Sequence, residues 1–226
     1  MHHLIQIHVD VGTLSLDVNV NFGNEMIVLS GENGAGKSTF LRCVAGLQEA
    51  VGQVHVGQEI WLDSSAGFAL PIVQRRLGYM WSEAVLLPWL SVEKNIMLGA
   101  SDVEKSWFEK LCEQFEINHL LKRKPLMLST GEAQRVSLVR ALCRKPSILL
   151  LDEPFSAQAP DIRGRLRMAL QGLQQELQIP IILVSHDIED AKVLAQHHWR
   201  MREGKLLSTI NTQSNESSKE QTKVEP

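Results

Sequence analysis

The residues best suited to chemistry form a glycine-rich stretch, Gly31–Thr39, with the sequence GENGAGKST. Its glycines let the backbone curl so that successive N–H groups point at one anion. Lys37 could reach the β- and γ-phosphates of a nucleotide, and the Ser38 hydroxyl could bind Mg²⁺. Because an apolar run, Met26–Leu29, precedes the stretch and a helix is expected over 38–44, the pattern predicts a phosphate-binding loop rather than a chance turn. The residues expected at the nucleotide are Gly31, Glu32, Asn33, Gly34, Ala35, Gly36, Lys37, Ser38 and Thr39.

Two acidic residues, Asp152 and Glu153, directly follow the apolar run Ser147–Leu151. In an ATPase with a phosphate-binding loop (P-loop), the first acid at such a strand end holds Mg²⁺, directly or through water. Asp152 takes that role, and Glu153 is then placed to orient or deprotonate the attacking water. Acid pairs at strand ends are also common as solvated surface groups, and it is the P-loop that favours the catalytic interpretation. The two motifs together predict ATP and Mg²⁺ as ligands.

Further segments identify a family when they are taken together with these two motifs. Leu128–Glu132 (LSTGE), followed by Gln134-Arg135, resembles the signature of ATP-binding-cassette (ABC) ATPases, usually LSGGQ followed by xQR. Val184–Asp187 (VSHD) resembles the switch-histidine segment, and Leu77–Ile96 resembles the Q-loop and the segment after it. Gly204-Lys205-Leu206 matches the glycine turn near the end of a cassette. In isolation, Ser129-x-x-Glu132 is equally a capping box that needs no ligand.

The resemblance implies an ABC ATPase fold, an α/β P-loop NTPase core with an antiparallel β subdomain and an inserted α-helical subdomain. It also implies a homodimer of head-to-tail cassettes with ATP between them. The signature of one subunit would contact the γ-phosphate on the P-loop of the other. Glu153 and His186 are then the expected catalytic residues, Ser38 and Asp152 the metal ligands. The signature residues expected at the nucleotide are Ser129, Thr130, Gly131 and Glu132.

The sequence departs from the family pattern at several of these positions. The Q-loop glutamine is Ser82, whose side chain is short for contact with Mg²⁺ and water. Thr130 replaces a glycine and fits only at negative φ, while Glu132 brings negative charge near a triphosphate unless it turns back to cap its own helix. The D-loop, usually SALD, reads SAQA over Ser156–Ala159, and Val11 stands nearest the position of the usual base-stacking aromatic residue. A hydrolysis-competent ATPase is expected, and these changes could slow it.

Hydrophobic patterning predicts the elements that position these residues. Leu4–Asp10 and Leu14–Asn21 alternate apolar and polar residues, as an antiparallel hairpin with one buried face would. The runs at Met26, Ser147 and Ile181 are apolar throughout, which is typical of strands buried on both faces. Alternation of such strands with helices predicts parallel pairing in a layered sheet. Further strands are expected within Gly52–Leu62 and Leu77–Trp81, and helices over Thr130–Leu142, Ile162–Leu177 and Ile188–Ala195.

The 226 residues suffice for one large α/β domain, which we expect over 1–210. A mostly helical subdomain at about 83–142 is expected as an insertion into it, and the polar residues 211–226 as a disordered tail. No apolar run approaches the ~20 residues that span a bilayer, and no export signal is visible at the N-terminus.

Composition narrows the compartment and the partners. The net charge of −3 provides no general attraction to nucleic acid or anionic lipid, so no nucleic-acid partner is expected. Cys43, Cys112 and Cys143 are odd in number and far apart, which argues for a reducing compartment and against a disulfide framework or zinc site. The pair His197-His198 is expected at the surface rather than at a metal, since adjacent residues of a strand project apart.

The favoured hypothesis is the ATP-hydrolysing subunit of an ABC importer, peripheral on the cytoplasmic face of the inner (cell) membrane. Its partners would be transmembrane permease subunits and a substrate-binding protein. Arg75–Tyr79, Leu87-Pro88 and the compact first hairpin look most like the molybdate and related oxyanion importers. Those ATPases often carry a C-terminal oxyanion-binding domain, whereas this sequence ends in a polar tail.

Two alternatives remain open. One is a soluble ABC ATPase of translation or DNA repair, although such proteins usually contain tandem cassettes or coiled-coil insertions, which this sequence does not show. The other is a degenerate cassette that dimerises on ATP with weak turnover, as Ser82 and Ala159 suggest. ATP-driven dimerisation without ATP hydrolysis would distinguish this last alternative from the ATPase of an importer.

Overall fold

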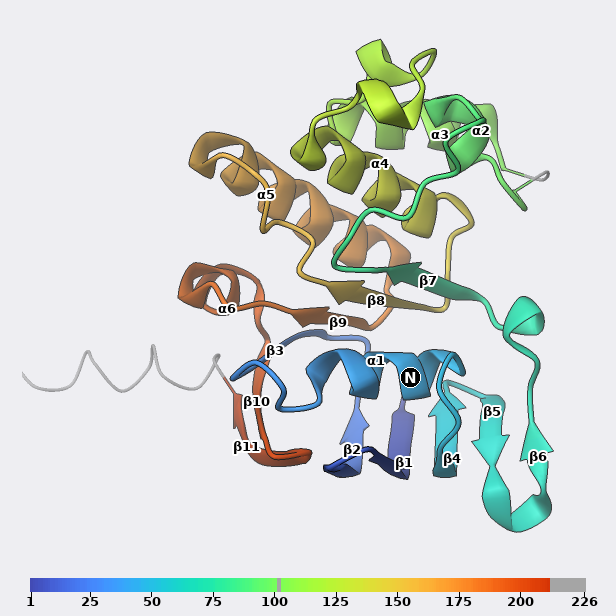
Figure 1. Cartoon of the computed structure of the whole chain (residues 1–226), viewed down its shortest axis with the longest axis vertical. Coiled ribbons are helices and arrows are strands. Elements are labelled where there is room, and N and C mark those ends of the chain that lie inside the picture. Colours follow the sequence, from blue (N-terminus) through green and yellow to red (C-terminus); the bar gives the residue numbers. More distant parts are fainter. Residues whose placement is uncertain (101–102, 212–226) are drawn as a thin grey trace, which may run out of the picture.

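A computed structural model describes residues 1–100 and 103–211 (Figure 1). The helices are α1 (Lys37–Ala45), α2 (Val92–Ile96), α3 (Lys105–Gln114), α4 (Thr130–Cys143), α5 (Pro160–Leu177) and α6 (Ile188–Leu194). The strands are β1 (His3–Val11), β2 (Leu14–Phe22), β3 (Met26–Gly31), β4 (Val51–Val56), β5 (Glu59–Asp63), β6 (Phe68–Ala69), β7 (Leu77–Met80), β8 (Ile148–Asp152), β9 (Ile181–Val184), β10 (His197–Arg202) and β11 (Lys205–Asn211). Short 3-10 turns lie at Ser64–Ala66, Ile72–Gln74, Asn118–Leu120 and Pro125–Met127. The tail expected to be disordered lies, from residue 212 on, outside the described residues.

The described strands form one sheet in the order β6-β5-β4-β1-β2-β11-β10-β3-β9-β8-β7. From β10 to β7 the neighbouring strands are parallel, which confirms the predicted parallel core. Along β8, Ile148 and Leu150 point into one hydrophobic core and Leu149 and Leu151 into the other. All four residues are fully buried, which explains why this strand is apolar on both faces instead of alternating.

The other half of the sheet is antiparallel and contains the predicted hairpin. β1 pairs with β2 from His3↔Phe22 to Val11↔Leu14, and Gly12 turns the chain at φ 60°. Strands β10 and β11 join this half to the parallel core, because β10 pairs with β3 and β11 pairs with β2. The sequence indicated only a strand position for the pair His197-His198 and the glycine turn between β10 and β11. Their charged residues hide the strand pattern, in which only Trp199 and Met201 are buried along β10.

Helix α1 lies between the antiparallel strands β1, β2 and β4 and the parallel strands β7–β9 (Figure 1). It buries Phe40, Leu41 and Val44 in the same core as Ile148 and Leu150. This packing fixes the start of α1, and therefore the loop before it, against the ends of the parallel strands.

The helices on the other side of β7–β9 are α4 and α5, with α2 and α3 beyond α4 (Figure 1). Helices α2 and α3 and most of α4 fall within the predicted helical subdomain, and 83–142 contains no strand among its described residues. Trp107 of α3 donates its indole N–H to the Cys143 carbonyl at 3.1 Å. This hydrogen bond connects α3 to the C-terminal end of α4. Within the described part of the chain, no helix is long and apolar enough to cross a membrane.

Candidate nucleotide-binding site

The loop between β3 and α1 is held in place by close packing at its glycines. Gly31 has φ 152°, and a Cβ there would lie 2.2 Å from the Met201 carbonyl oxygen of β10. Gly36 has φ 104° and immediately precedes α1, where a Cβ would lie 3.3 Å from Leu14. Backbone angles of this kind and such close contacts favour glycine. The loop therefore bends sharply and leads into the positive N-terminal end of α1.

Lys37 is buried at this bend, with only 7% of its surface exposed. Its ammonium donates to the carbonyls of Gly31 at 2.8 Å and Glu32 at 2.9 Å. Burial lowers the pKa of Lys37, and the nearby charges of Glu153 and Asp152 partly oppose that shift. The cation is thus fixed within the loop and close to two acids.

The loop opens into a cleft of about 620 Å³ at the carboxyl ends of β8 and β9. This volume is in the range of small-molecule sites. The cleft brings together the P-loop, the acid pair and the switch histidine, along with Ser82 and Val11, two of the residues that depart from the family pattern. Its lining consists of Val11, Leu14, Asn33, Gly34, Gly36, Lys37, Ser38, Thr39, Ser82, Asp152, Glu153, Val184 and His186. Of the other predicted loop residues, Gly31 packs on β10, Ala35 is buried and the Glu32 side chain is exposed.

Glu153 combines a strained backbone with a shifted ionisation. Its φ is 54°, a left-handed value that is uncommon for a residue other than glycine, and its N–H donates to the Val184 carbonyl at 3.1 Å. Burial, and then the neighbouring charge of Asp152, raise the pKa of Glu153 to about 7, although the charge of Lys37 opposes this rise. A carboxyl group with such a pKa can accept a proton near neutral pH and release it again.

His186 faces Glu153 across the cleft, with 3.2 Å between its Nε2 atom and Glu153 Oε1. Burial, followed by the positive charge of Lys37, lowers the pKa of His186. Its imidazole is therefore mainly neutral at neutral pH. Asp152, at the end of β8, is only 4% exposed and lines the same cleft.

The signature segment lies elsewhere, because Ser129, Thr130, Gly131 and Glu132 do not line this cleft. Ser129 Oγ accepts the Glu132 N–H at 3.2 Å, and Glu132 Oε2 accepts the Ser129 N–H at 2.8 Å. The capping box is therefore formed, and Glu132 turns back onto its own helix. The backbone N–H of Ser129 is the main cause of the lowered pKa of Glu132. Thr130 is not among the residues with positive φ, as its side chain requires.

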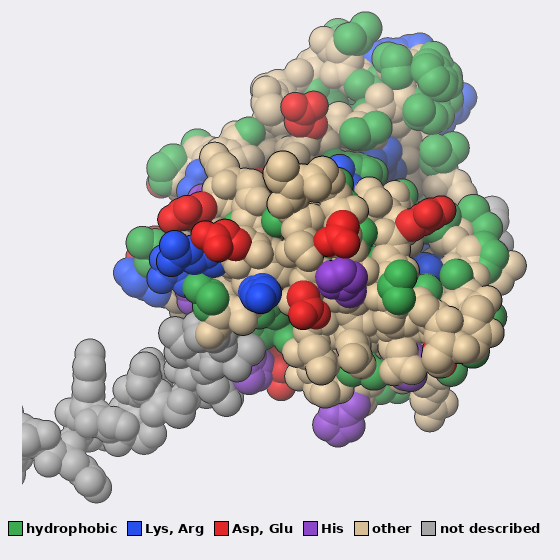
Figure 2. Space-filling view, turned by 60° about the horizontal axis from the view of Figure 1, so that its bottom comes forward, with side chains coloured by type: hydrophobic (Ala, Val, Ile, Leu, Met, Phe, Trp, Pro, Cys, Tyr) green, Lys and Arg blue, Asp and Glu red, His purple; other side chains and the backbone are tan. Residues whose placement is uncertain are grey.

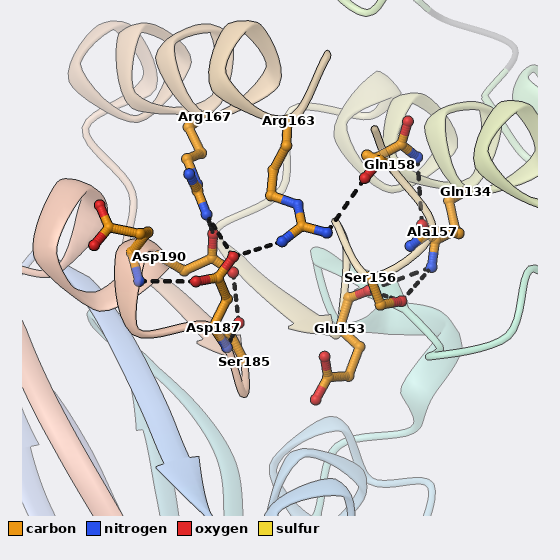
Figure 3. Close-up of polar contacts among 11 residues, drawn as sticks. Gln134, Glu153, Ser156, Ala157, Gln158, Arg163, Arg167, Ser185, Asp187 and Asp190 are labelled. Carbon is orange, nitrogen blue, oxygen red and sulfur yellow. Dashed lines mark hydrogen bonds and ion pairs between the residues drawn. The ribbon is translucent and has the colours of Figure 1, made fainter. Parts of the chain in front are cut away.

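A group of polar residues behind the cleft was not predicted from the sequence. Gln134 and Gln158 connect α4 to the D-loop, and Arg163 connects the D-loop to Asp187 (Figure 3). Gln134 belongs to the xQR match and could have been singled out. Gln158 and Arg163 are ordinary polar residues in a loop and on a helix, and only the fold brings them to their partners.

The adjacent histidines are half-buried, which corrects the expectation that they lie on the surface. The cause is that β10 is an internal strand of the sheet. His197 Nε2 lies 3.0 Å from Glu25 Oε2, whereas His198 Nε2 lies 2.8 Å from Ser30 Oγ. The three cysteines are free and buried.

A P-loop that opens toward strand-end acids and a switch histidine, within this sheet order, defines a nucleotide-binding cassette. A family model described as ABC transporter matches residues 13–156, and the chain belongs to that family. The fold is also that of a dimeric ATP-binding cassette solved in a post-hydrolysis state with ADP and phosphate. The two share a TM-score of 0.78 at 23% identity, over 94% of this chain and 99% of that one.

The curated relatives share one description. The chain is 40% identical over 207 residues to the molybdenum import ATP-binding protein ModC 1 of Azotobacter vinelandii, covering 88% of this chain and 57% of that protein. It is 35% identical over 211 residues to the molybdenum import ATP-binding protein ModC of Pseudomonas fluorescens, covering 91% of this chain and 59% of that protein. The chain therefore spans somewhat more than half the length of these relatives.

Proposed function

We propose that this chain is the ATP-binding and ATP-hydrolysing subunit that powers an ABC importer for molybdate or a related oxyanion. The observation that carries the proposal is the shared cleft, in which Lys37, Glu153 and His186 converge at the end of a P-loop. The choice of molybdate or a related oxyanion as the substrate rests on relatives at 35–40% identity, which are described as molybdenum import ATP-binding proteins.

In the proposed reaction, the loop N–H groups and the ammonium of Lys37 hold the phosphates of ATP. Glu153 accepts a proton from the attacking water, which its pKa of about 7 suits. His186, next to Glu153 and mainly neutral, donates a hydrogen bond to the phosphoryl oxygens as their charge develops. Lys37 acts from the end of the loop, whereas Glu153 and His186 act from just beyond the ends of β8 and β9.

Mg²⁺ fits the oxygen donors that line the cleft. Ser38 presents a hydroxyl and the nearly buried Asp152 a carboxylate, and Mg²⁺ prefers few protein oxygens together with phosphates and water. We propose these two residues as its ligands. When bound, the ion would neutralise the charge of the β- and γ-phosphates.

A second copy of the chain would complete the site. The signature lies outside its own cleft, and its N–H groups start the 14-residue helix α4. We infer a head-to-tail homodimer in which Ser129, Thr130 and Gly131 contact the γ-phosphate bound by the partner chain. Because Glu132 caps its own helix, its charge is directed back to Ser129 and toward Arg123, 3.7 Å away.

The membrane partners would dock beside the helical subdomain. Val85, Trp89, Leu126 and Met127 in this region are between 55% and 86% exposed. Hydrophobic side chains gather over this end of the molecule, whereas acids and bases are mixed over the rest of the same face (Figure 2). We propose that permease subunits bind here and that a substrate-binding protein serves them. The chain would then be peripheral on the cytoplasmic face of the membrane.

Two experiments test the proposal. Purified chain should hydrolyse ATP only with Mg²⁺, and turnover no faster than that of Glu153→Gln would contradict hydrolysis at this site. Deletion of the gene should reduce uptake of molybdate more than uptake of sulfate, and plasmid-borne wild-type chain should restore it. Unchanged uptake of molybdate and tungstate would remove the oxyanion assignment while leaving the ATPase proposal intact.

A further inference from the structure

Gln158, in the D-loop, is a buried polar residue with only 5% of its surface exposed. Its side-chain Nε2 donates to the Gly131 carbonyl at 2.9 Å and to Gln134 Oε1 at 3.3 Å. The residues Ser129–Glu132, which we call the signature turn, also pack directly on the D-loop backbone. A Cβ on Gly131 would lie 2.8 Å from the Ala157 carbonyl oxygen. A movement of the signature turn therefore either carries the D-loop with it or breaks the buried hydrogen bond between Gln158 and Gly131, which is costly.

Arg163, near the start of α5, continues the connection from the D-loop to the switch segment (Figure 3). Its Nη2 donates to the Gln158 carbonyl at 3.2 Å, and its Nη1 donates to Asp187 Oδ2 at 2.5 Å. Arg167, one turn further along α5, donates to the same Asp187 oxygen at 3.0 Å. One guanidinium thus spans the D-loop and the residue that follows His186.

The residues on both sides of His186 are fixed by this group of contacts. Ser185 Oγ donates to Asp190 Oδ2 at 2.5 Å and accepts the Asp187 N–H at 3.0 Å. Asp190 is 2% exposed and accepts from Arg167 Nε at 2.6 Å. The backbone at His186 is therefore held from α5, and its position against Glu153 depends on that hold.

The same group reaches Glu153 by a second route. Gln134 Nε2 donates to the Glu153 carbonyl at 3.4 Å and to Ser156 Oγ at 2.8 Å, while Gln134 Oε1 accepts the Ala157 N–H at 3.1 Å. Both catalytic candidates are thus connected to the signature turn of their own chain through the D-loop.

We propose that Gln158 and Arg163 are positioning residues that couple the signature turn to the switch histidine within one chain. The proposal rests on the proposed function, in which the signature turn contacts the nucleotide bound by the partner while His186 acts on the chain's own nucleotide. Docking of the signature on one ATP then sets His186 and Glu153 for hydrolysis of the other.

The test uses the full chain with Gln158→Met, Arg163→Gln and the double variant. Gln158→Met keeps the length of the side chain and removes its hydrogen bonds, without touching Glu153 or His186. The matched control is Arg165→Gln, on the same helix, whose ion pair with Glu116 at 2.5 Å lies outside this group. ATP affinity without Mg²⁺, melting temperature and steady-state kcat and KM are measured for each variant.

We expect kcat to fall about tenfold to a hundredfold in both single variants, because small displacements of catalytic groups have effects of this size. ATP affinity should stay within about twofold of wild type, since the P-loop is unchanged. The double variant should be about as slow as the slower single variant, because residues in one chain of contacts are not additive. Arg165→Gln should keep wild-type kcat.

Nuclear magnetic resonance gives a readout that does not depend on turnover. The imidazole signal of His186, assigned by loss in His186→Ala, should shift in Gln158→Met although that residue does not contact it. Unchanged kcat and an unchanged His186 signal, or multiplicative losses in the double variant, would overturn the coupling. An inactive wild type would contradict the proposed function instead, and the His186 signal would still test the coupling.

Discussion

The P-loop cleft and the signature turn use polar residues in opposite ways. The cleft gathers side chains from positions as distant as Val11 and His186, and several of them face open space at the ends of strands. At the signature turn, Ser129 and Glu132 satisfy each other, and Gly131 packs on the D-loop. The cleft therefore contains the candidate groups for chemistry, whereas the signature forms a capped helix end packed on the D-loop, where we propose that the partner's nucleotide binds.

The largest effect should follow from Glu153→Gln, which removes the proposed base and keeps the shape of the side chain. We expect kcat to fall by about 10²–10⁴-fold while ATP binding remains, because proton transfer is lost and the P-loop is intact. The matched control is Glu189→Gln, an exposed acid on α6 paired with Lys192. Similar losses in both variants would remove the special role of Glu153.

Lys37→Ala should weaken the binding of ATP itself. A hydrogen bond to a charged group contributes about 1.5–3 kcal/mol, so affinity should fall roughly tenfold to a hundredfold. Fluorescence titration with an ATP analogue measures it, and Lys105→Ala, on the exposed surface of α3, serves as the control. Unchanged affinity together with unchanged turnover would count against the assignment of the cleft.

The pH dependence should report on Glu153. Its pKa of about 7 means that kcat should fall by up to about tenfold per pH unit below that value, as the base becomes protonated. For stability the sign is also fixed, since the folded-state pKa lies above the usual 4.5. Wild type should lose stability relative to Glu153→Gln as pH rises from about 5 to 8, by at most about 2–3 kcal/mol. Thermal melts of the nucleotide-free proteins at several pH values that stay parallel would contradict the raised pKa.

Ser129→Ala is the mildest of these changes. It should lower stability only slightly, and it should also lower the turnover of ATP. Loss of a helix cap costs about 1 kcal/mol, which lowers the melting temperature by a few degrees. Ser91→Ala removes the equivalent cap of α2, where Ser91 Oγ accepts the Lys94 N–H at 3.3 Å. Both variants should lose similar stability, but only Ser129→Ala should also lose turnover. Equal turnover in the two would make the signature serine a cap and nothing more.

Much of the cleft could be predicted because its motifs are local. The P-loop occupies nine consecutive residues, and the acids and the histidine follow fully apolar strands whose carboxyl ends meet at one edge of the sheet. These strands were predicted because they are apolar throughout, and the first hairpin was predicted because apolar and polar residues alternate along it. The bounds of β10 and the strand β11 were not predicted; along β10 only two residues are buried, so its hydrophobic pattern is weak.

The surroundings of the signature could not be predicted in the same way. Glu132 could face a nucleotide or cap its helix, and the same sequence is compatible with both; the structure shows the capping box. Gln158 and Arg163 carry no local pattern, and the VSHD segment predicts nothing about the ion pair of Asp187 with Arg163, because their partners lie on other elements. Buried polar contacts between distant segments are set by the fold as a whole.

The central claim is that the cleft is complete only when the signature of a second chain meets its nucleotide. Sedimentation of Glu153→Gln with ATP tests it most directly, alone and combined with Thr130→Glu. That second change adds an acid at the start of α4, where it suits the helix but would repel the partner's phosphates. We predict an ATP-dependent dimer for Glu153→Gln, and a monomer with unchanged ATP affinity for the double variant. A Glu153→Gln chain that stays monomeric with ATP bound, or a double variant that dimerises equally well, would contradict the composite site.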